Sequence, residues 1–157
     1  MDRPNDNIIQ PTPDESFESD TQTTRRRWWW PFGGEVLTLG QRGERYATQF
    51  LKRRGFKILA RNYRCPAGEI DIIAFNEASA ATHPENCIVF VEVKTRTSDF
   101  HASPESAVDA KKQRKIKKAA AYYLLHHGQT DMVVKYDIIT ILADPKGTRI
   151  NHIPDAF

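Results

Sequence analysis

The stretch that decides the fold is CIVFVEVKTR, residues 87–96, which begins as an apolar strand and ends in charged residues. Side chains alternate between the two faces of a strand, so Glu92 and Lys94 share one face and the valines beside them share the other. Burying a carboxylate without a partner costs more free energy than the neighbouring apolar side chains return. The two charges therefore either lie at an exposed end of the sheet or face a charged ligand.

Length and composition predict one globular domain. A chain of 157 residues can bury one core, and 39% hydrophobic with 27% charged residues is ordinary for such a domain. No apolar run approaches the ~20 residues needed to cross a bilayer, so no membrane partner is expected. The N-terminus lacks a secretion signal, and Cys65 and Cys87 have no metal-ligand spacing. We therefore expect a cytoplasmic protein.

Charge divides the chain near residue 38. Residues 1–38 have a net charge of −3, whereas residues 39–157 have a net charge of +6. The first segment is rich in Pro, Asp, Ser and Thr, and it is predicted to be a disordered acidic tail that ends in an RRRWWW linker. We favour Trp side chains that fold back onto the domain; the alternative is an adhesive patch for nucleic acid or a membrane surface. Residues 39–157 are predicted to form the folded domain, whose charge suits a polyanion.

Hydrophobic periodicity predicts two helices. The first begins near Leu39 and stops at Gly55, and the second runs from Ser103 and Pro104 to about His127. Their apolar stripes consist of Tyr46, Ala47, Phe50 and Leu51 in the first helix and Ile116, Ala120, Tyr123 and Leu124 in the second.

Apolar runs predict five strands: FKILARNYR, GEIDIIAF, CIVFVEVKTR, MVVKYDIITIL and TRINHIPDAF. In the second of these strands, Ile70 and Ile72 are expected on the face opposite Asp71. The element order α-β-β-β-α-β-β predicts one α/β domain with a mixed central sheet flanked by helices.

Asp71 lies on the strand before Glu92, and antiparallel pairing would bring the two carboxylates within reach of each other. Two converging carboxylates suit a hard divalent cation such as Mg²⁺ or Mn²⁺, which also takes water and a phosphate oxygen. The ion offsets the repulsion between the carboxylates and neutralises charge on a phosphate in the transition state. Lys94 would orient the attacking water or stabilise that charge. Asp71 and Glu92 are therefore the predicted metal ligands.

The order of Asp and then Glu-x-Lys on the next strand resembles the PD-(D/E)xK nuclease superfamily. More narrowly, five segments resemble the YraN-like family of bacterial proteins: GQRGERYATQFLKRRGFKILARNYRCPAGEIDIIAF, VFVEVKTR, SPESAVDAKKQRKI, YDIITI and HIPDAF. That family is predicted to be endonuclease-like and is similar to archaeal Holliday-junction resolvases. The resemblance implies a restriction-endonuclease-like three-layer fold, and a catalytic set of Asp71, Glu92, Lys94 and, from the first helix, Glu44.

Two further acids have ordinary alternatives to a role in the site. Glu44 is either an additional metal or water ligand or an acid that favours a helix N-terminus. Glu69 either approaches the metal or pairs with Arg61 or Arg64. Asp137 interrupts an apolar strand, and we expect it to pair with a basic residue of the fold rather than to act in catalysis.

The predicted second helix is strongly basic over KKQRKIKK, residues 111–118. Such a run is often a solvated helix face, but here it directly follows the Glu-x-Lys strand, which favours contact with phosphates. Lys111 is expected to reach the active site itself. The predicted nucleic-acid-binding residues are Arg96, Lys111, Lys112, Arg114 and Lys115.

The sequence thus predicts a Mg²⁺- or Mn²⁺-dependent endodeoxyribonuclease that hydrolyses phosphodiester bonds in DNA, with branched and single-stranded DNA among the candidate substrates. A homodimer is compatible with this function, because symmetric junction cleavage needs two active sites. The alternative is a non-catalytic nucleic-acid-binding module on the same fold. A third and weaker alternative is an interaction protein that is anchored through RRRWWW.

Overall fold

The computed structural model describes residues 37–78, 85–97, 108–144 and 147–157. The order of elements in these residues is the predicted one, α-β-β-β-α-β-β. The elements are α1 (Leu39–Arg53), β1 (Lys57–Cys65), β2 (Gly68–Asn76), β3 (Cys87–Thr97), α2 (Ala110–His126), β4 (Val133–Asp144) and β5 (Gly147–Ile153). The RRRWWW segment lies outside the described residues.

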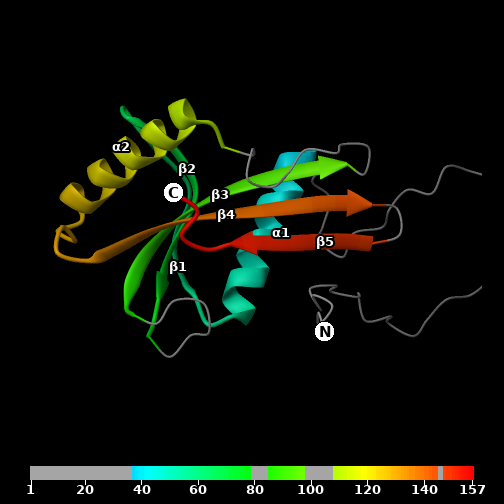
Figure 1. Ribbon diagram of the computed structural model, residues 1–157, viewed down its shortest axis with the longest axis horizontal. Helices are drawn as coiled ribbons and strands as arrows, with labels where there is room; N and C mark the ends of the chain where they lie inside the picture. Colours follow the sequence, from blue (N-terminus) through cyan, green and yellow to red (C-terminus); the bar gives the residue numbers. More distant parts are fainter. Residues whose placement is uncertain (1–36, 79–84, 98–107, 145–146) are drawn as a thin grey trace, which may run out of the picture.

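The strands form one five-stranded sheet in the order β1-β2-β3-β4-β5 (Figure 1). The first three strands are antiparallel neighbours, β3 and β4 are parallel, and β5 returns antiparallel to β4. Parallel neighbours require a crossover connection, and α2 lies in that connection. The predicted mixed sheet flanked by helices is confirmed, and it is the arrangement expected of a restriction-endonuclease-like domain.

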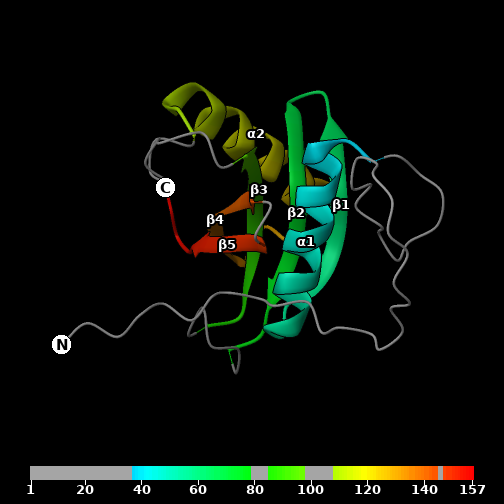
Figure 2. The same ribbon diagram turned by 90° about the vertical axis from the view of Figure 1, so that its right-hand side faces the viewer.

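Each face of the sheet is covered by a helix, which gives three layers (Figures 1 and 2). The alternation of β3 separates two cores, with Val89 and Val91 on the α1 side and Ile88 and Phe90 on the α2 side. Burial on both faces explains why β3 begins as an unbroken apolar run. Among the described residues, no helix is long and apolar enough to span a membrane.

Helix α1 forms where the sequence predicts it. Thr38 and Gln41 make a capping box, in which the Thr38 side chain accepts a hydrogen bond from the Gln41 N–H and the Gln41 side chain accepts one from the Thr38 N–H. Arg54 caps the C-terminus, and Gly55 follows at φ +89°, a conformation that favours glycine. The predicted stripe is also confirmed, because Ala47, Phe50 and Leu51 are buried and Tyr46 is half-buried.

Helix α2 begins later than predicted. Its N-cap is Asp109, whose backbone is extended and whose side chain accepts a hydrogen bond from the Lys112 N–H at 2.7 Å. The start predicted at Ser103 and Pro104 is therefore wrong for this helix, and those two residues lie outside the described part of the chain. Its C-terminal end at His126 agrees with the prediction.

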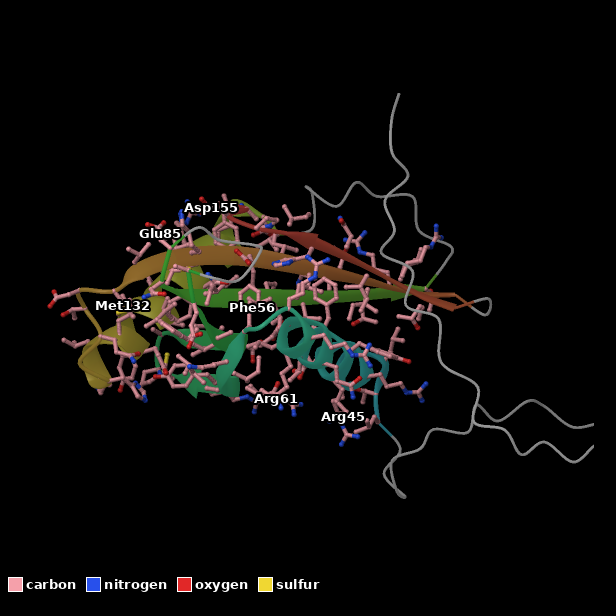
Figure 3. All side chains as sticks on the ribbon, turned by 90° about the horizontal axis from the view of Figure 1, so that it is seen from below. Arg45, Phe56, Arg61, Glu85, Met132 and Asp155 are labelled. Atoms are coloured by element: carbon pink, nitrogen blue, oxygen red, sulfur yellow. The ribbon has the colours of Figure 1, made fainter. Side chains whose placement is uncertain are left out.

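Polar contacts connect the C-terminal residues to β4. As expected, Asp137 pairs with a basic residue of the fold, because its Oδ2 lies 2.7 Å from His152 Nε2, and both side chains are almost completely buried. The Asp155 N–H also donates to Asp137 Oδ1 at 2.9 Å. Lys135 contacts both Glu85 and Asp155, which lie at the same end of the molecule in Figure 3. Phe56, also labelled there, packs in the α1-side core.

Helix α1 approaches β3 very closely at Gly43. A Cβ atom added to this buried glycine would lie 1.7 Å from Thr95 Oγ1 and 3.0 Å from Thr95 Cβ. Only a residue without a side chain fits this contact. The approach fixes the position of Glu44, the next residue of α1, relative to β3.

We therefore expect Gly43→Ala to lower the free energy of unfolding by about 1–3 kcal/mol, because the added methyl group overpacks the contact with Thr95. Gly40→Ala is the matched control on the same helix, since a Cβ there meets no atom within 4 Å. It should leave stability unchanged or raise it by up to ~1 kcal/mol through helix propensity. Urea unfolding of both variants measures this. Equal effects of the two substitutions would contradict the close contact, and Thr95→Ala should recover part of the loss in Gly43→Ala.

Candidate active site

The site lies where the pairing of β2 with β3 ends. The paired residues run from Asn76 and Cys87 to Ile72 and Val91. Beyond that point, Asp71 Oδ2 accepts a hydrogen bond from the Val93 N–H at 2.7 Å. The carboxylate thus replaces a backbone carbonyl as the acceptor for β3, and the Asp71 side chain is directed along the sheet toward the neighbouring strand.

The alternation of β2 changes phase at Asp71. Ile70 belongs to the α2-side core and Ile72 to the α1-side core, so the prediction that they share a face is wrong. The physical reason is a local distortion of the neighbouring strand. In β1, Asn62 lies between the residues that pair with Ile72 and Ile70, and so it lies opposite Asp71. The φ of Asn62 is +50°, in the left-handed region. Asn tolerates this conformation better than most residues, and such strain is typical of functional sites.

Glu92 is a buried carboxylate held by two lysines. Its side chain is only 3% exposed, and its Oε1 lies 2.7 Å from Lys94 Nζ and 3.2 Å from Lys112 Nζ. Among the described residues, Glu92 Oε2 has no hydrogen-bond partner although it is buried. A buried carboxylate oxygen of this kind has a large unmet demand for a donor or a cation. On the charged face predicted for β3, Glu92 is therefore a buried, ion-paired acid, and its lysine partners are half-buried.

The electrostatics of Asp71 reflect this cluster. Burial raises its pKa, the negative charge of Glu92 raises it further, and together they bring the pKa to about 6. The hydrogen bond from Val93 and the charge of Lys112 act in the opposite direction, and Glu44 makes the smallest contribution, which raises the pKa. Two carboxylates thus lie close enough to repel each other in a poorly solvated place, an environment that a bound cation would relieve.

The donor set fits a hard divalent cation. Asp71 and Glu92 supply carboxylate oxygens, including the unpartnered Oε2 of Glu92, and Mg²⁺ is commonly bound by one or two carboxylates with water and phosphate oxygens. Within the described ranges, no three Asp, Glu, His or Cys side chains converge closely enough to form a metal site. The structure therefore does not assemble Glu44 with Asp71 and Glu92 as a set of three ligands. Glu44 is half-buried on α1, near enough to affect the charge of Asp71.

Among the basic residues of α2, Lys112 reaches the site. Lys111 was expected to do so, but it is exposed, and the next residue along the helix faces Glu92 instead. A rotation of 100° per residue separates the two side chains, and the helix start at Ala110 sets which of them faces the sheet. Arg114 and Lys115 are exposed.

Two other predicted residues lie beside the site. Arg96 is half-buried on β3, and alternation places it on the face of Glu92 and Lys94. Glu69 is exposed, 4.0 Å from both Arg64 Nε and Lys112 Nζ, so it belongs to the edge of the cluster.

Sequence reasoning missed the backbone irregularity of Asn62, opposite Asp71, and the close contact of Gly43 with Thr95. Asn is a poor strand former, so its position in the middle of ARNYR was a signal of irregular backbone. Gly43 follows a helix N-terminus, where a glycine has several explanations, and its partner Thr95 is far away in sequence.

The profile of the Uncharacterised protein family UPF0102 matches residues 43–141. The chain belongs to this family. The matched residues include Glu44, Asp71, Glu92 and Lys94, and the match confirms the expected membership of the YraN-like group. A UPF0102 protein of Geobacter metallireducens is 44% identical over 120 residues, which is 76% of this chain and 92% of that relative. One from Caldanaerobacter subterraneus is 42% identical over 123 residues, or 76% of this chain and 94% of the relative.

The charge of Asp71 should destabilise the metal-free fold. Its pKa of about 6 lies above the ordinary 3.8, so the folded state binds the proton more tightly than the unfolded state does. The free energy of unfolding should therefore fall as pH rises from about 4 to about 6, by ~3 kcal/mol for this group. In EDTA at pH 7.5, Asp71→Asn should be more stable than the wild type by a comparable amount, and at pH 4 the difference should nearly vanish.

Thermal and urea unfolding between pH 4 and pH 8 measure this difference. Glu69→Gln, which removes an exposed carboxylate from the same strand, is the control and should change stability by less than ~0.5 kcal/mol. If Asp71→Asn were less stable than the wild type at every pH, the ionised carboxylate would be a structural element of the fold.

Proposed function

We propose that this protein is a Mg²⁺-dependent nuclease that hydrolyses phosphodiester bonds in DNA. The observation that carries the proposal is the pair of carboxylates at the open end of the β2–β3 ladder, Asp71 and Glu92, with Lys94 Nζ 2.7 Å from Glu92 Oε1. Family membership by itself assigns no activity. The raised pKa of Asp71 and the unpartnered oxygen of Glu92 support an assignment to a reactive site rather than to a structural ion pair.

Each residue has a role that follows from its chemistry. Asp71 and Glu92 would hold the cation, which when bound supplies an activated water and neutralises charge on the phosphate. The Asp71 carboxylate is kept in place by the Val93 N–H, so its remaining lone pairs face the site. Lys94 is suited to orient the attacking water or to stabilise negative charge on the phosphate oxygens. Glu44 would influence Asp71 through its negative charge, which raises the pKa of Asp71.

DNA fits the surroundings of the site. The basic residues of α2 follow β3, and Lys112 extends from that helix to Glu92. Lys and Arg side chains bind the phosphate backbone without reading base sequence, so we expect activity to depend on the shape of the DNA. Free Cys65 and Cys87 fit a reducing compartment, and we place the protein in the cytoplasm.

A non-catalytic nucleic-acid-binding module is the second candidate. The observation that favours it is that both Lys94 and Lys112 form ion pairs with Glu92 Oε1. In such a module the ion pairs would be structural and the basic residues would carry the binding. The two candidates differ in their dependence on metal, since a module of this kind binds DNA equally in EDTA.

Cleavage of a panel of labelled DNAs tests the proposal. Duplex, single strand, flap and four-way junction are incubated with the full chain in Mg²⁺, Mn²⁺ or EDTA. We expect cleavage only with metal, and Asp71→Asn or Glu92→Gln should reduce it at least ~100-fold, because each removes a predicted metal ligand. Lys94→Gln should also reduce the rate strongly at unchanged DNA affinity.

Glu85→Gln is the matched control, since it removes an acid that pairs with Lys135 outside the site. It should cleave as the wild type does. Cleavage that survives in EDTA, or that is equal in Asp71→Asn, would contradict the assignment. Retarded but uncut DNA in every condition would instead establish the binding module.

A further inference from the structure

A pocket of about 530 Å³ lies between the β1–β2 hairpin and α2, outside the group formed by Asp71, Glu92 and Lys94. The hairpin contributes both ends of its turn, and the helix contributes two lysines that lie three residues apart and so on one side of it. The lining residues are Arg64, Cys65, Gly68, Glu69, Lys112 and Lys115. Its volume is within the range of small-ligand sites.

Gly68 allows the hairpin to approach the helix this closely. Its φ of +149° favours glycine, and a Cβ atom there would lie 3.4 Å from the Lys115 carbonyl oxygen and 3.7 Å from Ala119 Cβ. The wall of the pocket is therefore backbone at this point.

The lining is cationic, and the pairs between its own side chains are weak. It carries three positive side chains against one carboxylate, and that carboxylate, Glu69, lies at 4.0 Å from both Arg64 Nε and Lys112 Nζ. The Arg64 side chain is 81% exposed and Glu69 is 59% exposed. Exposed pairs at this distance are weak, so a backbone phosphate can replace Glu69 as the partner of Arg64.

Lys112 connects the pocket to the active site. Lys112 lines the pocket, and its Nζ lies 3.2 Å from Glu92 Oε1. An anion bound in the pocket and a phosphodiester placed at Glu92 would therefore lie on either side of one lysine. Successive phosphates along a polynucleotide strand would supply two such neighbouring anions.

We propose that this pocket binds one backbone phosphate of a polynucleotide strand, through Arg64, Lys112 and Lys115, next to the position at which the strand is cut. That the strand is cut at the neighbouring phosphate rests on the proposed function. That the pocket binds the strand does not depend on it. Of the basic residues of α2, Lys112 and Lys115 line the pocket. Arg64 of β1 also lines it, and the sequence did not predict Arg64 as a ligand. Glu69 competes with the phosphate for Arg64.

Binding is measured with the full chain in EDTA, so that no cleavage occurs, by fluorescence anisotropy of a labelled 12-nucleotide single strand and of its duplex. Arg64→Gln and Lys115→Gln should each weaken binding about three- to tenfold and lower the slope of log affinity against log salt by roughly 0.7–0.9. Glu69→Gln should tighten binding, because it removes the competing carboxylate. The two oligonucleotides are then compared. The one whose affinity falls more in the variants shows whether the phosphate belongs to a single or a double strand.

Arg53→Gln is the matched control. Arg53 is exposed at the C-terminal end of α1, which packs on the opposite face of the sheet from α2. It should change affinity by less than twofold. Equal losses for Arg53→Gln and Arg64→Gln would overturn the proposal in favour of diffuse attraction to a basic surface, and so would a failure of both probes to bind the wild type.

Cys65 gives an independent measurement. It is half-buried in the pocket wall, whereas Cys87 is fully buried in the core, where burial raises its pKa to about 11. Iodoacetamide should therefore alkylate Cys65 selectively, and the bound oligonucleotide should slow this reaction at least ~3-fold in the wild type but not in Arg64→Gln. An unchanged alkylation rate in the presence of saturating oligonucleotide would contradict the pocket as the binding place.

These results separate the two proposals. Protection of Cys65 and loss of affinity in Arg64→Gln, without metal-dependent cleavage by the wild type, would retain the pocket and reject the nuclease. Metal-dependent cleavage that requires Asp71, with normal binding in Arg64→Gln and Lys115→Gln, would retain the nuclease and reject the pocket.

Discussion

The hydrogen bond from the Val93 N–H to Asp71 is the interaction on which the site depends. It occurs where the ladder between β2 and β3 ends, so a side chain meets the need of a backbone donor that would otherwise be unsatisfied. The same bond directs Asp71 toward β3 and so toward Glu92. Two acidic residues from different strands thereby come together inside a sheet that is otherwise covered by apolar cores on both faces.

Several features around this bond oppose stability. Asp71 is half-buried beside another carboxylate, and Asn62 opposite it has a left-handed backbone. Gly43, which lowers the helix propensity of α1, allows the close contact with Thr95. These unfavourable features lie within one region, whereas elsewhere the strands keep the regular alternation of their apolar residues. Concentration of strain and buried charge in one place is the usual sign that selection acts on function there rather than on folding.

The order of elements could be predicted from the sequence because it depends on local periodicity and on the stop signal at Gly55. The pairing of Asp71 with Glu92 followed from hairpin connectivity. The sequence could not predict which face of α2 packs against the sheet. That face depends on the N-cap at Asp109, which competes with an equally good start signal at Ser103 and Pro104. A rotation of one residue exchanges Lys111 for Lys112. Likewise, the phase change between Ile70 and Ile72 arises from Asn62 on another strand, which no pattern within β2 records.

The position of Lys112 between Glu92 and the pocket has a consequence for ligand binding. One ammonium group neutralises a carboxylate on one side and lines a cationic pocket on the other. A divalent cation at Glu92 would take over the neutralisation of that carboxylate and leave more of the lysine's charge for an anion. By thermodynamic reciprocity, the anion would then raise the affinity for the cation by the same factor. Metal and strand would bind cooperatively through a single side chain, without any change in the backbone.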